Sequence, residues 1–246
     1  DIPGAPRTIR FGTNLPLSNE KMGLGFNIVN DQLGPMTQTY ADISYSYQVN
    51  LSEETKLSFG IDAGGSFLNV DFAKGTFENP GEPLANEAIS NFYPTIGAGT
   101  FLYSDNWYLG VSIPNFLTEG IYNDEVATVV DDKIQFNFIG GYVFNISDGL
   151  KFKPAFLFKY VAGAPVIVDL SANFMFNEKL RLGVAYRWDD AFSGLIGFQV
   201  SPKLLIGYAY DYTNTELQKV TTGSHEIMLR FDLVSKSKKL KSPRFF

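Results

Sequence analysis

The single histidine of the chain, His225, is the residue best suited to acid–base chemistry. Ser224 precedes it and Glu226 follows it, and a serine, a histidine and a carboxylate are the groups with which hydrolases activate a nucleophile. Nothing else in the sequence positions such a triad. The plainer interpretation is a polar residue near the end of a strand, so we assign no catalytic residue.

Metal and nucleotide chemistry have even less support. The chain has one His, no Cys and no carboxylates clustered at ligand spacing, so no metal site is predicted. Gly23-Leu24-Gly25 and Gly97-Ala98-Gly99 resemble fragments of nucleotide-binding loops, but each alternates within a predicted strand and no helix follows. Glycine there is a small inward-facing residue. No cofactor is predicted.

The stretch from Leu180 to Tyr212 indicates the kind of secondary structure that positions the residues of this chain. It holds three consecutive runs in which every second residue is apolar, separated by gaps of two or three residues. This period is typical of β-strands joined by hairpins. In the first run Leu182 and Val184 share one face, whereas Arg181 and Gly183 share the other. Small and charged residues cannot fill the core of a sandwich, but they suit the inner face of a transmembrane barrel whose outer face meets lipid.

The same alternation continues along the chain and predicts an all-β, antiparallel transmembrane β-barrel with thirteen strands. They are expected at about residues 8–17, 22–30, 38–51, 57–64, 93–103, 107–113, 134–144, 151–160, 166–176, 180–188, 191–200, 204–212 and 224–234. The long segments 73–91 and 114–132 are predicted to be loops.

Composition agrees with a membrane barrel. Among 246 residues, 22 Phe, 13 Tyr and 23 Gly are unusual for a soluble domain. No window approaches the roughly 18 uninterrupted apolar residues of a membrane helix, so strands must make any membrane contact. The net charge of −6 disfavours a nucleic-acid partner. The absence of Cys leaves the redox state of the compartment open.

The strand count is odd, whereas bacterial barrels normally have an even number of strands and both termini in the periplasm. A fourteenth strand is therefore expected before Asp1. Residues 1–234 are predicted to form the barrel, and 235–246 a basic periplasmic tail. Loop lengths indicate the same orientation, because short connections fall on the periplasmic side and the long ones, 73–91, 114–132 and 213–223, fall outside.

Charged residues on the predicted inner face are nearly balanced in sign. Unpaired charges in a narrow lumen are costly, so we expect ion-pair networks that rigidify the barrel rather than the single-sign ring of a selective pore. The predicted network is Arg10, Asp42, Asp62, Lys159, Asp169, Arg181, Arg187, Asp211, Glu226 and Arg230.

Several longer segments carry a family resemblance. They include GLGFNIVNDQLGP at 23–35, WYLGVSIPN at 107–115, AGAPVIVDLSANF at 162–174, GSHEIMLRFDL at 223–233 and the terminal SPRFF. Through these segments the chain resembles, over essentially its whole length, the PorP/SprF family of outer-membrane proteins of the type IX secretion and gliding-motility system. Members of that family usually begin with a signal peptide, an Asn/Pro-rich segment and a first strand. This sequence lacks all three, in keeping with the expected upstream strand.

The resemblance implies a non-enzymatic protein in the outer membrane of a Gram-negative bacterium. It implies binding of a secreted adhesin through the C-terminal domain of that adhesin, with type IX secretion components and outer-membrane lipid as further partners. Anchoring at the cell surface should use the external loops or the lumen. The residues expected to contact the adhesin are Phe77, Glu78, Phe116, Tyr122, Asp124 and Tyr212.

Two alternatives stay open. The family also includes proteins that tether the secretion machinery to periplasmic partners, a role that would use the C-terminal tail. The tail residues expected to serve it are Lys238, Lys239, Lys241, Arg244 and Phe246. A barrel alone is also compatible with a diffusion porin.

Overall fold

The structure is a computed structural model, and it describes residues 4–17, 21–74, 88–117, 120–123, 126–131, 133–215 and 222–233. Several predicted contact residues lie outside these ranges. They are Phe77, Glu78 and Asp124 in the external loops, and Lys238, Lys239, Lys241, Arg244 and Phe246 in the tail. The predictions that involve them remain predictions.

The described residues form one large antiparallel sheet. Its strands are β1 (Arg7–Pro16), β2 (Met22–Leu33), β3 (Met36–Asn50), β4 (Lys56–Asp71), β5 (Ala88–Tyr103), β6 (Trp107–Ile113), β9 (Gln135–Tyr142), β10 (Phe144–Ser147), β11 (Leu150–Val161), β12 (Ile167–Phe176), β13 (Leu180–Arg187), β14 (Ala191–Ser201), β15 (Leu204–Thr213) and β16 (Ser224–Phe231). Apart from β10, which lies off this order and pairs with β11, successive strands of the sheet are neighbours, from β1 at one end of the order to β16 at the other. The predicted all-β antiparallel fold class is confirmed.

The sheet counts fourteen strands, although the sequence predicts thirteen in this part of the chain. The extra strand arises because β9 and β10 are separated only by Val143 and both lie against β11. The β10–β11 register also shifts between Asn145 and Ser147, which marks an irregularity of the bulge type. All thirteen predicted positions therefore contain a strand. The strand expected before Asp1 remains a prediction.

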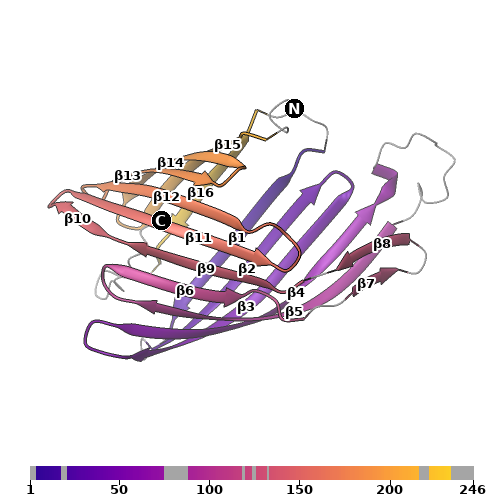
Figure 1. Cartoon of the computed structure of the whole chain (residues 1–246), viewed down its shortest axis with the longest axis horizontal. Helices are drawn as coiled ribbons and strands as arrows, with labels where there is room; N and C mark the ends of the chain where they lie inside the picture. The colour runs from indigo at the N-terminus through magenta and orange to yellow at the C-terminus, as the bar shows by residue number, and fades with distance from the viewer. Residues whose placement is uncertain are drawn as a thin grey trace. The chain divides into compact units, whose positions relative to one another are not determined.

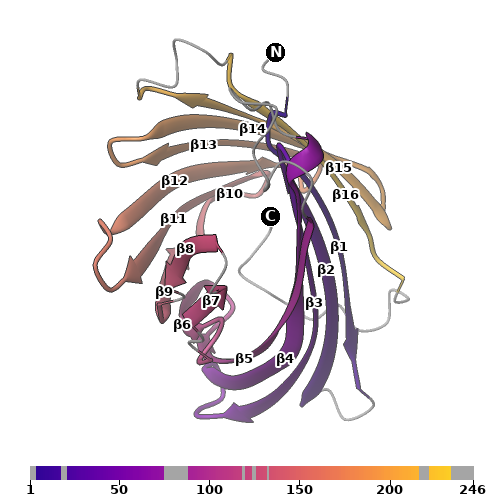
Figure 2. The same ribbon diagram turned by 90° about the vertical axis from the view of Figure 1, so that its right-hand side faces the viewer.

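The two long loops differ from the prediction. The segment 114–132 contains a separate hairpin of β7 (Gly120–Asn123) and β8 (Val126–Asp131), which the sequence analysis missed (Figure 2). Strand β4 extends to Asp71 and β5 already begins at Ala88, so the loop predicted at 73–91 is shorter at its C-terminal end. Between them, η1 (Phe72–Lys74) is one 3-10 turn.

Within the described residues, no helix has the length and apolar character needed to cross a bilayer. The chain divides into two compact units, one of residues 1–49, 58–100 and 112–136, the other of residues 50–57, 101–111 and 137–246. In the first unit, β1, β2 and β3 lie side by side (Figure 2). In the second unit, β11 to β15 lie side by side in chain order (Figure 1), and β16 pairs with β15.

Tight turns fix the register of the second unit. The turn between β12 and β13 places Asn177 and Glu178 at φ of 49° and 56°, the left-handed region that short polar residues tolerate better than branched ones. The Lys179 amide donates to the Phe176 carbonyl at 2.9 Å, which closes the turn. Phe176 then pairs with Leu180, and every following residue pairs in sequence as far as Asp169 with Arg187.

The two faces of the strands have opposite character, as the alternation predicts. Large apolar residues such as Phe11, Val184 and Ile227 are 61%, 62% and 76% exposed. Several charged or polar residues are instead buried, among them Lys153 and Arg181 at 5% exposure each. Soluble proteins bury apolar residues and expose charges, so this reversal is the arrangement of a protein with a lipid-facing outer surface and a polar inner face.

Candidate functional site

A hollow of about 400 Å³ lies on the inner face of the second unit, mainly over strands β11 to β16. Its wall combines charged, polar and small residues. Those that carry charge or hydrogen-bonding groups are Tyr108, Lys153, Asp169, Ser171, Asn173, Ser193, Asp211 and Glu226. Glycine and alanine at Gly183, Ala185 and Ala209 leave the space open. The hollow therefore offers donors and acceptors of both signs to a bound group.

The floor of the hollow is held by a buried amide. Asn173 is 9% exposed, and its Nδ2 donates to the Lys153 carbonyl at 3.3 Å and to Ser171 Oγ at 3.1 Å. Gly183 pairs with Asn173 across β12 and β13, and a Cβ at Gly183 would lie 2.5 Å from Asn173 Oδ1. A larger residue at position 183 would therefore have to displace the Asn173 amide.

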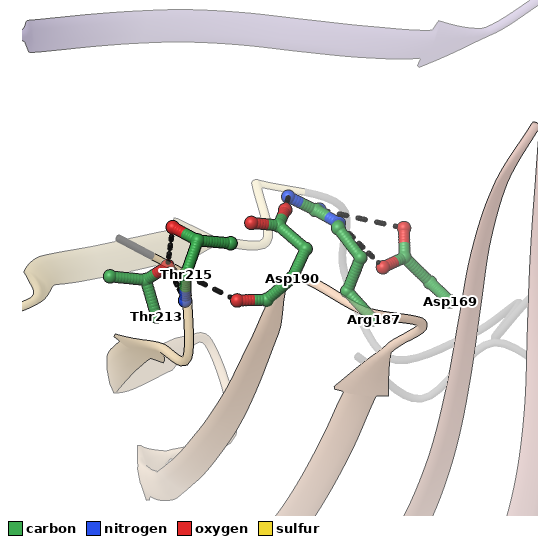
Figure 3. A network of polar contacts seen from close by, with 5 residues as sticks. All are labelled: Asp169, Arg187, Asp190, Thr213 and Thr215. Atoms are coloured by element: carbon green, nitrogen blue, oxygen red, sulfur yellow. Dashed lines mark hydrogen bonds and ion pairs between the residues drawn. The ribbon is translucent and has the colours of Figure 1, made fainter. Parts of the chain in front are cut away.

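One end of the inner face carries a connected polar network (Figure 3). Arg187 Nε donates to Asp169 Oδ1 at 2.8 Å, and Arg187 Nη1 reaches Asp190 Oδ2 at 3.4 Å. The Asp190 carbonyl accepts a hydrogen bond of 3.1 Å from Thr213 Oγ1, which also contacts Thr215 Oγ1 at 2.9 Å. The network joins β12, the β13–β14 turn and the end of β15, and we call it the loop-end network.

The β13–β14 turn places Asp190 in this network. Asp189 adopts a φ of 54°, and aspartate is one of the few residues that visits the left-handed region readily. The Asp190 amide donates to the Arg187 carbonyl at 3.1 Å, so the turn folds back on the arginine that its side chain contacts. The Trp188 amide donates to the Val168 carbonyl at 2.9 Å and fixes the turn to β12.

The opposite end of the same face, where β12–β13 and β14–β15 turn, carries a second arginine cluster. Arg181 Nη2 donates to Gln199 Oε1 at 3.3 Å, and Arg230 Nη2 contacts Asp232 Oδ2 at 3.4 Å. The two guanidinium groups are near enough to repel each other electrostatically, and Asp232 attracts that of Arg181. Beside them, Leu205 is completely buried. We call Arg181, Gln199, Leu205, Arg230 and Asp232 the turn-end cluster.

Charges on β11 to β16 and their turns are sorted by end. The loop end carries two cations, Lys159 and Arg187, with five carboxylates, Asp169, Asp189, Asp190, Asp211 and Glu226. The turn end carries six cations, Lys151, Lys153, Lys179, Arg181, Lys203 and Arg230, with three carboxylates, Asp148, Glu178 and Asp232. The near balance seen in the sequence thus conceals an acidic end and a basic end.

The structure brings together some of the predicted network residues. Asp169 pairs with Arg187, and Arg181 lies near Arg230. In the first unit, Asn27 Nδ2 donates to Asp42 Oδ1 at 3.0 Å, and Asp42 lies near enough to Asp62 to repel it. Arg10, Lys159, Asp211 and Glu226 form no ion pair with the described residues. A network running through all ten residues stays a prediction.

The described residues of the predicted external contact set are accessible. Phe116 is 42% exposed and Tyr212 is 40% exposed. Tyr122 lies in β7, and only its backbone is described. Sequence reasoning did not assign Asp190, Thr213, Thr215, Asn173 or Gln199 to the site. The alternation places Asn173 and Gln199 on the inner face without singling them out, whereas the turn residues carry no periodic signal.

His225 lies beside two tyrosines. His225 Nδ1 lies 2.7 Å from Tyr208 Oη, and its ring packs on Tyr210 with centroids 5.1 Å apart. Ser224 is the adjacent residue in β16, so its side chain projects to the opposite face of the strand from His225. This geometry does not build a serine–histidine pair from these two residues.

The chain matches one family of known proteins over most of its length. A family model described as "Type IX secretion system membrane protein PorP/SprF" matches residues 1–231. No curated protein sequence matches the chain. Among solved structures, the chain is similar to a FadL homologue of Pseudomonas aeruginosa, with a TM-score of 0.48 and 13% identity over 83% of this chain and 70% of the other.

Proposed function

The chain belongs to the PorP/SprF family of type IX secretion system membrane proteins, and from this premise we propose that it is a non-enzymatic outer-membrane protein that anchors a secreted adhesin at the cell surface. The adhesin would be held through its own C-terminal domain. Outer-membrane lipid would cover the apolar outer face. The long loops would lie outside the cell and the C-terminus in the periplasm, as loop lengths indicate.

The observation that supports this proposal is the hollow on the inner face, with its charges sorted by end. A polypeptide presents backbone donors and acceptors together with charged side chains, and the hollow offers partners for each of these groups. A pore selective for small ions would instead display a ring of one sign. At the loop end, Asp211 and Glu226 form no ion pair with described residues and are available to basic side chains of a partner.

Co-purification from native membranes tests the proposal. The intact chain should retain the C-terminal domain of the adhesin. Neutralising two carboxylates of the hollow with Asp211→Asn and Glu226→Gln should weaken binding by about tenfold, since charge-assisted hydrogen bonds contribute this much. Glu178→Gln is the matched control, because it removes one carboxylate from an exposed turn where it pairs with Lys151.

The exposed loop residues provide a second test. Phe116→Ala and Tyr212→Ala should each lower adhesin binding, because exposed aromatic residues often contribute strongly to protein interfaces. An adhesin that stays surface-attached after deletion of this protein would contradict the proposal. Stable conductance in planar bilayers, unaffected by the adhesin, would favour a porin instead.

Removal of the C-terminal tail distinguishes adhesin anchoring from the alternative role, the tethering of periplasmic secretion components. A chain that ends at Val234 lacks the basic tail but keeps β16 (Ser224–Phe231). Adhesin anchoring predicts that the shortened chain still retains the adhesin. Loss of periplasmic secretion components together with retained adhesin would assign the tail a separate tethering role. Loss of the adhesin on truncation would contradict anchoring through the loops and the hollow.

A further inference from the structure

We propose that Arg181 and Arg230 of the turn-end cluster form a binding site for an oxyanion, the phosphate or carboxylate group of a ligand. This inference does not depend on which protein the chain anchors. It concerns the end of the inner face opposite to the loop-end network, outside the residues that line the hollow.

The strand register brings the two arginines together across two intervening strands. Arg181 of β13 is opposite Gly197 of β14, and Gly197 is opposite Gly207 of β15. The two glycines leave the inner face without side chains beside Arg181, whose Nη2 reaches Gln199. Arg230 of β16 is opposite Leu205, which in turn is opposite Gln199. Both arginines therefore lie on the inner face, on either side of β14 and β15, and are near enough to interact electrostatically.

The electrostatic arrangement favours an anion. Arg181 and Arg230 repel each other, and Asp232 is the carboxylate that interacts with both. Nε of Arg230 is buried and has no hydrogen-bond partner among the described residues. The Arg230 side chain as a whole is 41% exposed, so the outer N–H groups of its guanidinium are open to an incoming oxygen atom. An oxyanion bound there would neutralise the repulsion between the two arginines.

Arginine is the side chain best suited to this task. Its guanidinium group presents several N–H donors in a fixed plane that matches the oxygens of phosphate and carboxylate. Further cations lie at the same end, at Lys151, Lys179 and Lys203. They raise the local positive potential and attract an anion from a distance.

The test uses the full-length chain in detergent micelles, with inorganic phosphate as the probe. Urea unfolding is followed while phosphate replaces chloride at constant ionic strength. We expect the unfolding midpoint to rise and saturate with phosphate, because a ligand of the folded state stabilises it. Arg230→Gln should weaken the apparent affinity by about tenfold or more, the effect of losing hydrogen bonds between charged groups.

Arg187→Gln is the matched control, because Arg187 lies on the inner face of β13 as Arg181 does but already binds Asp169 and Asp190. It should leave the phosphate response unchanged. Arg230→Lys keeps the positive charge but lacks the planar guanidinium group, so it should bind phosphate with an intermediate affinity. The test therefore does not depend on whether Arg230→Gln folds. An equal response to phosphate and chloride, or an equal loss in Arg187→Gln, would overturn the proposal.

A second titration separates the two sources of the oxyanion. Acetate supplies a carboxylate and phosphate supplies a tetrahedral anion with more oxygens. If only phosphate shifts the midpoint in an Arg230-dependent manner, the ligand is a phosphate group. If acetate acts as well, with the same dependence on Arg230, the site accepts a polypeptide carboxylate. If neither anion acts through Arg230, the site is not an oxyanion site.

Discussion

Strand β13 carries an arginine near each end of its inner face, and the two are held in different ways. Arg187 has a side chain that is 47% exposed, yet it contacts Asp169 and Asp190. Arg181 is only 5% exposed, and its hydrogen bond to Gln199 is made to a neutral amide. The more exposed arginine thus contacts two carboxylates, whereas the more buried one lies near both a second arginine, Arg230, and a carboxylate, Asp232.

The loop end and the turn end of the inner face therefore have different roles. Arg187 joins a strand to a turn, and Thr213 and Thr215 extend the connection to β15. Such a network fixes the loop end in one arrangement. At the turn end, Arg181 and Arg230 lie beside Asp232, and their mutual repulsion adds no such restraint. The proposed oxyanion site rests on this arrangement.

The ends also differ in packing. Leu205 at the turn end has no exposed surface, although it lies on the inner face with the charged residues. Leu195, on the same face of the neighbouring strand, lines the hollow instead. One leucine is enclosed by its neighbours and the other borders open space, so the same truncation should have different costs.

The largest expected effect follows from this difference. Leu205→Ala should lower the free energy of unfolding by about 2–5 kcal/mol, because a closed site leaves a cavity when a leucine is shortened. Leu195→Ala should cost less, about 1 kcal/mol, since it only enlarges an existing hollow. Urea unfolding followed by tryptophan fluorescence measures both. Equal losses would show that the two ends are packed alike.

A smaller effect separates the two arginines. Arg187→Gln should lower the free energy of unfolding by about 1 kcal/mol, because it leaves Asp169 and Asp190 without their shared cation. Arg230→Gln should change it by less than about 0.5 kcal/mol in chloride, since the lost contact with Asp232 is offset by relief of the repulsion on Arg181. Destabilisation by Arg230→Gln as large as that by Arg187→Gln would remove the distinction between the ends.

The alternation of residues was enough to predict the strands and their faces. Leu182 and Val184 were expected to face lipid, and their side chains are exposed. Arg181 and Arg187 were expected on the inner face, and both belong to clusters there. A period of two is a property of the backbone itself, so it can be recognised without knowing what any strand pairs with.

What the sequence did not predict depends on register and on turns. The approach of Arg181 to Arg230 requires four strands to be aligned, and the β14–β15 register shifts between Gln199 and Ser201. A shift of this kind has no periodic signal, yet it decides which residues meet. Asp190 contributes through its position in a turn, where alternation stops. The β7–β8 hairpin lies in a segment whose acidic residues favoured a loop.

The smallest expected effect is the change of the unfolding free energy with salt, which should have opposite signs in Arg230→Gln and Arg187→Gln. Raising the ionic strength from about 0.01 M to about 1 M shortens the screening length from roughly 30 Å to 3 Å. In Arg230→Gln, salt should destabilise the protein by a few tenths of a kcal/mol, because it weakens the pairing of Arg187 with its carboxylates. In Arg187→Gln, salt should stabilise it by a similar amount, because it screens the repulsion between Arg181 and Arg230. Chloride is the anion in both titrations, so specific phosphate binding does not contribute.

If the unfolding free energy changes with salt in the same direction in both variants, one of the two arginine clusters does not behave as its contacts indicate. The phosphate titration would then show whether it is the turn-end cluster.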